Sequence, residues 1–371
     1  MNKLKIALVK QEVYQDLYVC PVTEKDPGQI LFSSMGRVGP IALMSDLNAD
    51  FYIVKEESNK ETRIYQKVIP HIAPYLHLLK TETLDKIPGQ EFKSPGSPYP
   101  NGKYAVSCYT IDWGQYDIVI SINISLPTQL ILKYPQTLFA YMIGEANMAT
   151  GKARFGYDAT LNQMARGRIS HKCGAIDFPY TFVAKDTLEK IMQQYLGRPS
   201  ARKGIFMEIN STTERPVTRI PDHFQPLADA GYEIILHQQK IADNLKNIYD
   251  AKYFVKMGGR SIRGNSVAEA ASLGTLAIMN RDEVIHHELI IDECNVKTMD
   301  EMISLINRLE NDPELYRTLQ QKQRQVLHTY FFDAPLQSLI NCLKEKRGLS
   351  KPRTYSRWNR LFDNLYFLKL R

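Results

Sequence analysis

Three glycines and two arginines fall within the short stretch Gly258-Gly-Arg-Ser-Ile-Arg-Gly264. The apolar run before it, residues 253–257, predicts a β-strand, and the small residues after it, 266–273, predict a helix. A loop between a strand and a helix directs several backbone N–H groups and the positive end of the helix dipole at one point, where anions bind. The side chains of Arg260 and Arg263 can add charge-assisted, bidentate bonds to a phosphate group.

Glu269 lies one helical turn into the predicted helix. From there its carboxylate can reach the hydroxyls of a ribose whose phosphate is held by the loop. The local chemistry is therefore that of a site for a nucleoside diphosphate. The alternative is a tight strand–helix turn in which the glycines only permit close packing.

The segment Gly264-Asn-Ser-Val-Ala-Glu-Ala-Ala-Ser-Leu-Gly-Thr-Leu-Ala-Ile278 resembles the nucleotide-sugar-binding segment of GT-B glycosyltransferases. The resemblance covers residues 200–335 and specifies a superfamily rather than a substrate. It implies an α/β protein whose two doubly wound parallel-sheet domains face a central cleft. It also implies a reaction that needs no metal ion or other cofactor, and donor contacts at Gly264, Asn265, Ser266 and Glu269.

The sequence departs from the family at one position. Many retaining GT-B enzymes carry two glutamates with seven residues between them, the first of which meets the donor sugar and the second the ribose. Glu269 matches the second glutamate, but Ser261 stands at the position of the first. We therefore favour an inverting enzyme over a retaining one.

Further donor contacts are predicted where other strands of the second half end. The strand at 205–209 leads into Asn-Ser-Thr-Thr, where the hydroxyls of Ser211 and Thr212 can hold phosphate; a plain Ser/Thr turn is the alternative. His237 ends the strand at 232–237. In GT-B enzymes the loop at this place often contacts the nucleobase, mostly through its backbone, so the resemblance makes His237 a candidate ligand.

A second glycine loop lies in the first half of the chain. Met35-Gly-Arg-Val-Gly-Pro40 precedes an apolar run with a helical pattern and resembles the loop after the first strand of GT-B folds. The resemblance implies that this loop lines the cleft near the donor phosphates or the acceptor through Gly36, Arg37 and Gly39.

An inverting transferase needs a base that takes the proton from the acceptor hydroxyl. Glu145 is the first candidate, because it follows the strand at 137–143 directly. Asp112, beside Trp113, is the second candidate, and Asp16 is the third.

The length and composition are those of a two-domain protein. A chain of 371 residues is long for one hydrophobic core. No stretch approaches the roughly 20 apolar residues of a membrane span, and the first residues lack a signal-peptide pattern. Five scattered cysteines form no metal-binding spacing and suggest reduced thiols, so we expect a cytoplasmic protein.

The net charge of +7 is concentrated at the C-terminal end. Residues 346–371 hold eight Lys or Arg and one acid, a net +7, so residues 1–345 are balanced and a nucleic-acid partner is not indicated. Trp358, Leu361 and Leu365 recur at helical spacing, which predicts a basic amphipathic helix on an anionic membrane surface. The alternative is a terminal helix that packs on the first domain.

Alternating strands and helices predict two α/β halves with parallel sheets. In the first half we expect strands at 4–9, 51–55, 104–109, 117–122 and 137–143, and helices near 39–48, 62–79 and 127–134. In the second half we expect strands at 205–209, 232–237, 253–257, 275–279 and 289–291. Two further helices should begin at the capping box Thr298-Met-Asp-Glu301 and at Asp312-Pro-Glu-Leu315.

We therefore expect an N-terminal acceptor-side domain (1–196), a C-terminal nucleotide-sugar-binding domain (197–345) and a basic tail (346–371). The predicted function is transfer of a sugar from a nucleotide-diphosphate sugar to a glycan or lipid-linked glycan in polysaccharide biosynthesis. The enzyme would be cytoplasmic and peripheral on the inner face of the membrane. One alternative is a nucleotide-sugar epimerase of the same fold, which needs several acids in the cleft. Another is a non-catalytic glycan- or nucleotide-binding protein, which would lack the base.

Overall fold

The structure, a computed structural model, describes residues 4–11, 18–19, 30–31, 42–54, 73–79, 110–122, 126, 128–143, 156–162, 175–177, 182–208, 217–237, 241–259, 261–262, 264–354 and 356–358. The chain divides into two compact units. Unit 1 consists of Met1–Leu17, Gly39–Phe182 and Asp333–Arg371, and unit 2 of Tyr18–Val38 and Val183–Phe332. Each unit contains a parallel sheet with helices, which confirms the predicted α/β class.

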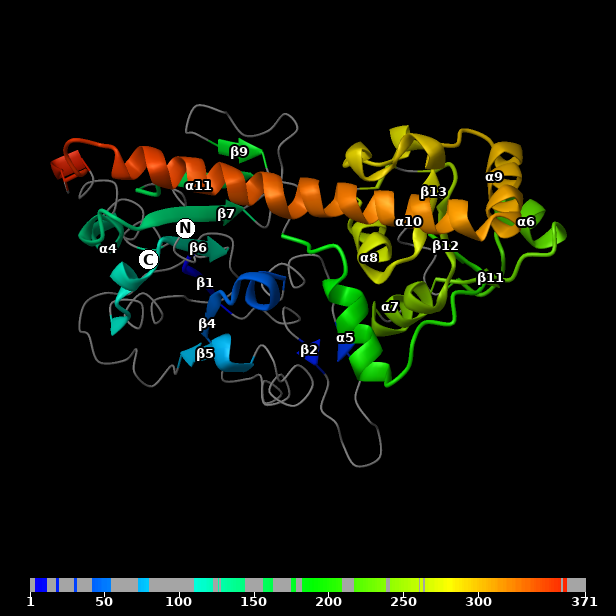
Figure 1. Cartoon of the computed structure of the whole chain (residues 1–371), viewed down its shortest axis with the longest axis horizontal. Coiled ribbons are helices and arrows are strands. Elements are labelled where there is room, and N and C mark those ends of the chain that lie inside the picture. The colour runs from blue at the N-terminus through cyan, green and yellow to red at the C-terminus, as the bar shows by residue number, and fades with distance from the viewer. Residues whose placement is uncertain are drawn as a thin grey trace. The chain divides into compact units, whose positions relative to one another are not determined.

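Among the residues that the structure describes, the sheet of unit 1 has seven parallel strands. Most of them are labelled in Figure 1. Their order across the sheet is β5 (Leu76–Leu79), β4 (Asp50–Val54), β1 (Ile6–Gln11), β6 (Ile118–Ile122), β7 (Leu138–Ile143), β8 (Ala159–Asn162) and β9 (Ala175–Asp177). The order reverses between β1 and β6, as in doubly wound folds. The central strands read as continuous apolar runs because they are buried on both faces; Leu8, for example, pairs with Phe51 on one side and Ile120 on the other.

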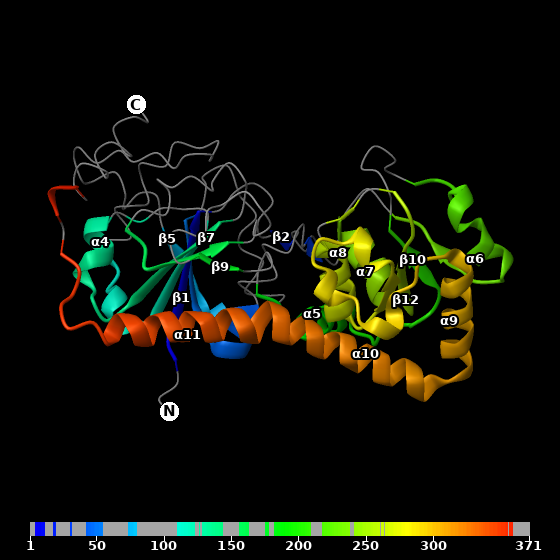
Figure 2. The ribbon, with the colours of Figure 1, turned by 90° about the horizontal axis from the view of Figure 1, so that it is seen from above.

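Helices connect and cover the strands of unit 1. In the described part of unit 1 they are residues 42–47, α4 (Thr128–Lys133) and α11 (Ala334–Arg347), with 3-10 turns η2 (Ala73–Tyr75) and η4 (Trp113–Gln115). Figure 2 shows α11 running along this sheet, where it contacts β7 and β9. Leu339 and Leu343 of α11 are buried, so the helix contributes its apolar side to the core of unit 1.

The described residues of unit 2 form a sheet of four parallel strands. Their order is β11 (Ile234–Ile235), β10 (Ile205–Met207), β12 (Tyr253–Lys256) and β13 (Leu276–Met279). The order reverses between β10 and β12, and the carboxyl ends of strands at such a switch point are where open α/β sheets bind ligands. The short antiparallel ribbon β2 (Tyr18–Val19) and β3 (Ile30–Leu31) also belongs to this unit.

Helices lie against both faces of this sheet. Within the described residues they are α5 (Thr187–Leu196), α6 (Gln225–Asp229), α7 (Ile241–Asp250), α8 (Asn265–Leu273), α9 (Met299–Asn311) and α10 (Pro313–His328), with 3-10 turns η8 (Asp222–Phe224), η9 (Arg281–Glu283), η10 (His287–Leu289) and η11 (Asp292–Cys294) and the short π-helix η12 (Thr329–Asp333). One face of the sheet, which includes Met207 and Val255, packs with Ile306 of α9. Buried alanines of α8, such as Ala270 and Ala271, let that helix lie close to β13.

The predicted starts of two helices are confirmed. Thr298 and Glu301 form the capping box of α9: Thr298 Oγ1 accepts a hydrogen bond from the Glu301 amide (3.2 Å), and the Glu301 carboxylate accepts one from the Thr298 amide (3.3 Å). Asp312 caps α10 by accepting a bond from the Leu315 amide (2.9 Å), with Pro313 at the first helical position. These contacts satisfy amides that have no partner inside a helix.

Two predicted elements are wrong. The helix expected at 62–79 is contradicted where the structure describes it, because residues 73–75 form a 3-10 turn and Leu76–Leu79 pair with β4 as an edge strand. The strand expected at 289–291 is the last residue of η10 followed by irregular chain, and the Ile290 carbonyl accepts bonds of 3.1 and 2.7 Å from the Arg281 guanidinium instead of a strand neighbour. The strand expected at 104–109 lies outside the described residues.

The units divide at other points than the expected boundaries at 196 and 345. Helix α5 belongs to unit 2, because it packs on α8 and its Glu189 pairs with Arg202 (2.5 Å) and with Arg324. The chain from Asp333 onward belongs to unit 1, because α11 packs on β7. The C-terminal part of the chain thus completes the unit in which the chain begins.

Candidate functional site

The candidate site begins with the β12–loop–α8 segment predicted from the sequence. Gly258 and Gly259, which follow β12 after Met257, have φ angles of 71° and 74°, which residues with a side chain rarely adopt. Gly264 has φ 111° and is the N-cap of α8; a Cβ there would lie 3.0 Å from Cγ2 of Val284. The glycines are therefore required by the backbone path of the loop.

The first turn of α8 faces the end of this loop. Its amides have no partner within the helix, and a glycine at the N-cap supplies no side-chain oxygen to them. Asn265 and Ser266 occupy this turn and are half-buried. Glu269, also half-buried, follows one turn later. Backbone donors thus lie at the start of α8, and the side chain of Glu269 leaves the helix one turn further along.

Four ionisable side chains form a row along the carboxyl edge of the unit 2 sheet. Each follows or ends a strand region: His237 after β11, Glu208 after β10, Lys256 at the end of β12, and Glu283 in the segment after β13. Their side chains are 7%, 7%, 0% and 16% exposed. Because burial of charge is costly, clusters of this kind mark functional sites more often than other positions.

Glu208 and His237 face each other at one end of the row. Oε1 of Glu208 lies 3.9 Å from Nε2 of His237. The His237 ring also lies 3.3 Å from Nδ2 of Asn244 on α7, and its centroid is 5.8 Å from that of Phe206. The His237 carbonyl accepts a bond from the Val217 amide (3.4 Å). The imidazole is therefore packed inside unit 2, beneath the strand ends.

Of the residues predicted to bind the donor, the structure brings Gly264, Asn265, Ser266 and Glu269 together on α8, at the same sheet edge as His237. The remaining predicted donor and loop residues lie outside the described part of the chain: Arg260, Arg263, Ser211, Thr212, Gly36, Arg37 and Gly39.

Among the candidate bases, Asp112 is described and Glu145 and Asp16 are not. Asp112 is exposed, and its Oδ1 accepts a bond from the Gly114 amide (3.1 Å) as the N-cap of η4. This turn precedes β6, so Asp112 lies at the amino end of that strand, opposite the edge where such sheets bind ligands. Its observed role is to cap a turn.

Sequence reasoning missed Glu208, Lys256 and Glu283. A signal was present for the first two. Glu208 interrupts the apolar run Ile205-Phe-Met-Glu-Ile, and Lys256 interrupts Tyr253-Phe-Val-Lys-Met. A charged residue at the carboxyl end of a buried parallel strand is unusual enough to indicate a site.

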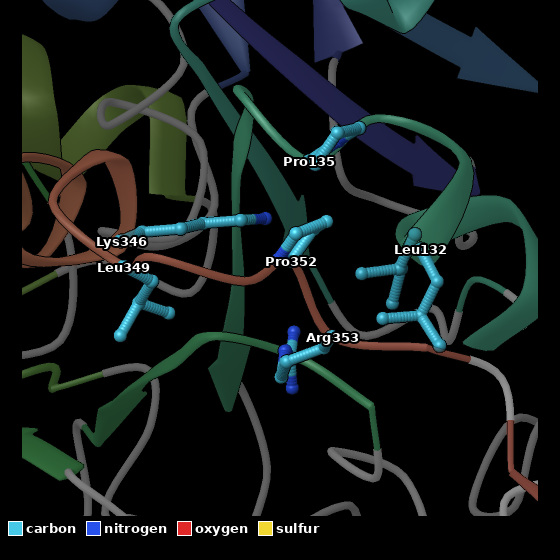
Figure 3. Close-up of a pocket in the computed structure, with 7 residues that line it drawn as sticks. Leu132, Pro135, Lys346, Leu349, Pro352 and Arg353 are labelled. Carbon is cyan, nitrogen blue, oxygen red and sulfur yellow. The ribbon is translucent and has the colours of Figure 1, made fainter.

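A second surface feature is a pocket between α4 and the chain after α11, both in unit 1 (Figure 3). It is lined by Ile131, Leu132, Pro135, Lys346, Leu349, Pro352 and Arg353. Lys346 donates to the Thr137 carbonyl (2.6 Å) and to Asp158 (2.7 Å), and its burial lowers its pKa. Arg353 also pairs with Asp158.

Arg347 binds the same unit at a neighbouring place. Its guanidinium donates to Asp117 (2.7 Å) and to the Gln136 carbonyl (3.0 Å). The start of the basic tail is therefore fixed to unit 1 by three of its cations. Within the residues that the structure describes, no helix is long and apolar enough to cross a membrane.

No family model and no curated protein matches the sequence. Among solved structures, the chain is similar to sucrose-phosphate synthase from Thermosynechococcus elongatus, with 13% identity and a TM-score of 0.44 over 93% of this chain and 98% of the other. It is similar to HepE from Anabaena in complex with UDP and glucose, with 10% identity and a TM-score of 0.43 over 93% of this chain and 100% of the other. It is also similar to the N-terminal domain of trehalose-6-phosphate phosphatase from Candida albicans, with 10% identity and a TM-score of 0.46 over 93% of this chain and 97% of the other.

Proposed function

We propose that this chain is a glycosyltransferase that binds a nucleotide-diphosphate sugar at the carboxyl edge of the unit 2 sheet. One observation carries the proposal. The β12–loop–α8 segment, whose glycines have backbone angles that other residues avoid, presents the first turn of α8 beside the switch point between β10 and β12. Backbone donors at this place suit a diphosphate.

The proposed catalysis is mainly electrostatic. Arg260, Arg263 and the first turn of α8 stabilise the negative charge that develops on the departing nucleoside diphosphate. Glu269 binds the ribose hydroxyls. A carboxylate of unit 1, Glu145 first and Asp16 next, takes the proton from the acceptor hydroxyl as it attacks the sugar. Ser261 at the place of the donor-facing glutamate supports an inverting reaction, and no metal ion is required.

The proposed acceptor is a glycan or a lipid-linked glycan, with the enzyme in the cytoplasm and peripheral on the inner face of the membrane. Two large apolar side chains of the tail support a membrane surface, because Leu349 is 57% exposed and Trp358 69%. Lys351 and Arg357 are exposed beside them in the sequence. Interfacial aromatics with nearby cations are the composition that anionic bilayers attract.

The test is binding of UDP, GDP, ADP and CDP, followed by turnover of the matching nucleotide sugars. A nucleotide at about 100 times its Kd adds about 2.7 kcal/mol of stability, which a melting curve detects. Arg263→Ala should weaken binding by about 1.5–3 kcal/mol, as should Arg260→Ala, since each loses a charge-assisted hydrogen bond. Unchanged affinity in both variants contradicts the proposed site. An epimerised donor, or binding without turnover, contradicts the transferase.

A further inference from the structure

Lys256 and Glu283 form a buried ion pair that holds the glycine turn after β12. Nζ of Lys256 donates to Oε2 of Glu283 (2.7 Å) and to the Gly258 carbonyl (2.6 Å). Oε1 of Glu283 accepts from the Gly258 amide (2.9 Å). Both backbone polar groups of Gly258 are thus bonded to the pair, which fixes the two peptide planes on either side of a residue with φ 71°.

The same segment also holds the loop further along. The Ile262 amide donates to the Glu283 carbonyl (2.9 Å), and the Ile285 amide donates to the Ile262 carbonyl (2.8 Å). These bonds form an isolated parallel bridge between Ile262 and Val284. Gly258 and Ile262, near the two ends of the loop, are therefore both held by residues 283–285.

The energetics of the pair point to a geometric role. The Lys256 side chain is fully buried and that of Glu283 is 16% exposed. Taking both charges out of water costs roughly what their attraction returns, so a buried pair is often replaceable by uncharged residues without loss of stability. Loss of one partner alone is strongly destabilising, because the other charge stays buried. Apolar residues could not form the two hydrogen bonds that the pair makes with the amide and carbonyl of Gly258, and these bonds fix the orientation of its backbone.

We infer that Lys256 and Glu283 are positioning residues that preorganise the loop for the donor diphosphate. This inference rests on the proposed function. Preorganised donors bind charge without the cost of ordering a flexible loop at the moment of binding. The pair therefore contributes to nucleotide affinity although neither side chain is needed as a ligand.

The test compares the wild-type chain with Lys256→Met, Glu283→Gln and the double variant. Each single variant should be less stable, whereas the double variant, which buries no charge, should recover most of the wild-type stability. In the double variant the amides from Gly258 to Ile262 should nevertheless exchange with solvent about tenfold faster than in the wild type. Its affinity for the tightest binder among UDP, GDP, ADP and CDP should be about tenfold weaker, a loss of about 1.4 kcal/mol.

A matched control lies at the other end of the same strand region. Lys252 pairs with Glu310 at 2.9 Å, and the double variant Lys252→Met with Glu310→Gln should leave loop exchange and nucleotide affinity unchanged. Wild-type exchange rates in the Lys256 and Glu283 double variant overturn the inference. If the loop amides of this double variant exchange faster but its nucleotide affinity is unchanged, the pair has no role in nucleotide binding, and the proposed function stands. If the wild type binds none of the nucleotides, the proposed function fails, and exchange alone decides whether the pair holds the loop.

Discussion

The carboxylate of Glu208 lies 3.9 Å from Nε2 of His237, and both side chains are 7% exposed. The two residues follow neighbouring parallel strands, β10 and β11, so the sheet itself brings them together. Asn244 of α7 contacts the same imidazole. A buried carboxylate and a buried imidazole are thus fixed beside the switch point where we propose that the nucleotide binds.

We expect the two residues to be energetically coupled. His237→Ala removes an imidazole that packs against the buried Glu208 carboxylate, and should cost about 1–3 kcal/mol of unfolding free energy. In the background of Glu208→Gln the same change should cost less by about 0.5–3 kcal/mol, because no charge is then left behind. Urea denaturation of the four proteins followed by circular dichroism measures this difference. Additive losses would show that the pair does not interact.

Glu269→Gln should weaken nucleotide binding without unfolding the chain. A carboxylate accepts hydrogen bonds at two oxygens, whereas the amide accepts at one. The expected loss is about 1.5–3 kcal/mol, as for a hydrogen bond to a charged group. Calorimetry with the nucleotide measures it, and a melting curve is the control. Full affinity, or melting tens of degrees lower, would make Glu269 a structural residue.

Gly264→Ala should destabilise unit 2 more than Gly197→Ala. Both glycines have positive φ, 111° and 63°. A Cβ on Gly197 meets no atom within 4 Å, whereas one on Gly264 meets Val284 at 3.0 Å. We expect about 1 kcal/mol for the control, from the backbone angle alone, and about 1–3 kcal/mol more for Gly264. Equal losses in urea denaturation would contradict a tight backbone path before α8.

Local patterns were sufficient to predict much of unit 2. The apolar run ending at Met257, the small residues of α8 and the run from Thr275 each carry their own signal, and the structure confirms β12, α8 and β13 within two residues. Thr298 and Asp312 were predictable because a helix cap depends on residues three positions away. In unit 1, β8 and β9 were not predicted, since each contains only one β-branched residue and no aromatic residue, the types that mark strands.

The charged row at the sheet edge required the fold. Lys256 and Glu283 are 27 positions apart, and their pairing depends on how β12 and the segment after β13 lie in space. Leu76–Leu79 became a strand through pairing with β4, a partner distant in sequence. The residues around Pro74 do not indicate that β4 lies beside them. Strand formation depends on neighbouring strands more than on the strand's own residues.

Stability of unit 2 should fall in acid as Asp250 is protonated. Burial alone would raise the pKa of Asp250, but hydrogen bonds from Arg198 and from the Ala201 amide outweigh it, and the pKa lies below its ordinary value of 3.8. A carboxyl with a lowered pKa contributes stability that is complete above the unfolded value and is lost as pH falls through the folded value.

Asp250→Asn should therefore be less stable than the wild type at neutral pH, and the difference should narrow below about pH 4. Urea denaturation at a series of pH values measures it. Asp292→Asn is the control, because its partner Arg281 also lowers the pKa of Asp292, but that carboxylate is 86% exposed and should contribute little. If wild type and Asp250→Asn differed in unfolding free energy by the same amount at all pH values, the lowered pKa of Asp250 would be contradicted.

The tail should separate into cations that hold unit 1 together and cations that meet a membrane. Arg347 and Arg353 pair with Asp117 and Asp158, so Arg347→Ala with Arg353→Ala should lower stability and leave vesicle binding nearly unchanged. Lys351 and Arg357 are exposed, and each contributes about 1 kcal/mol near an anionic surface.

Replacing Lys351 and Arg357 by glutamate, with Trp358→Ala, should therefore abolish sedimentation with vesicles of anionic lipid and leave the melting temperature unchanged. Wild-type binding should weaken as salt rises, because the attraction is screened within about 8 Å at physiological ionic strength. A chain cut after Glu345 is a poorer test, since it also removes the bonds of Lys346 and Arg347 to unit 1. If the triple variant sediments like the wild type, the exposed tail residues do not bind membranes, and the tail serves to complete unit 1.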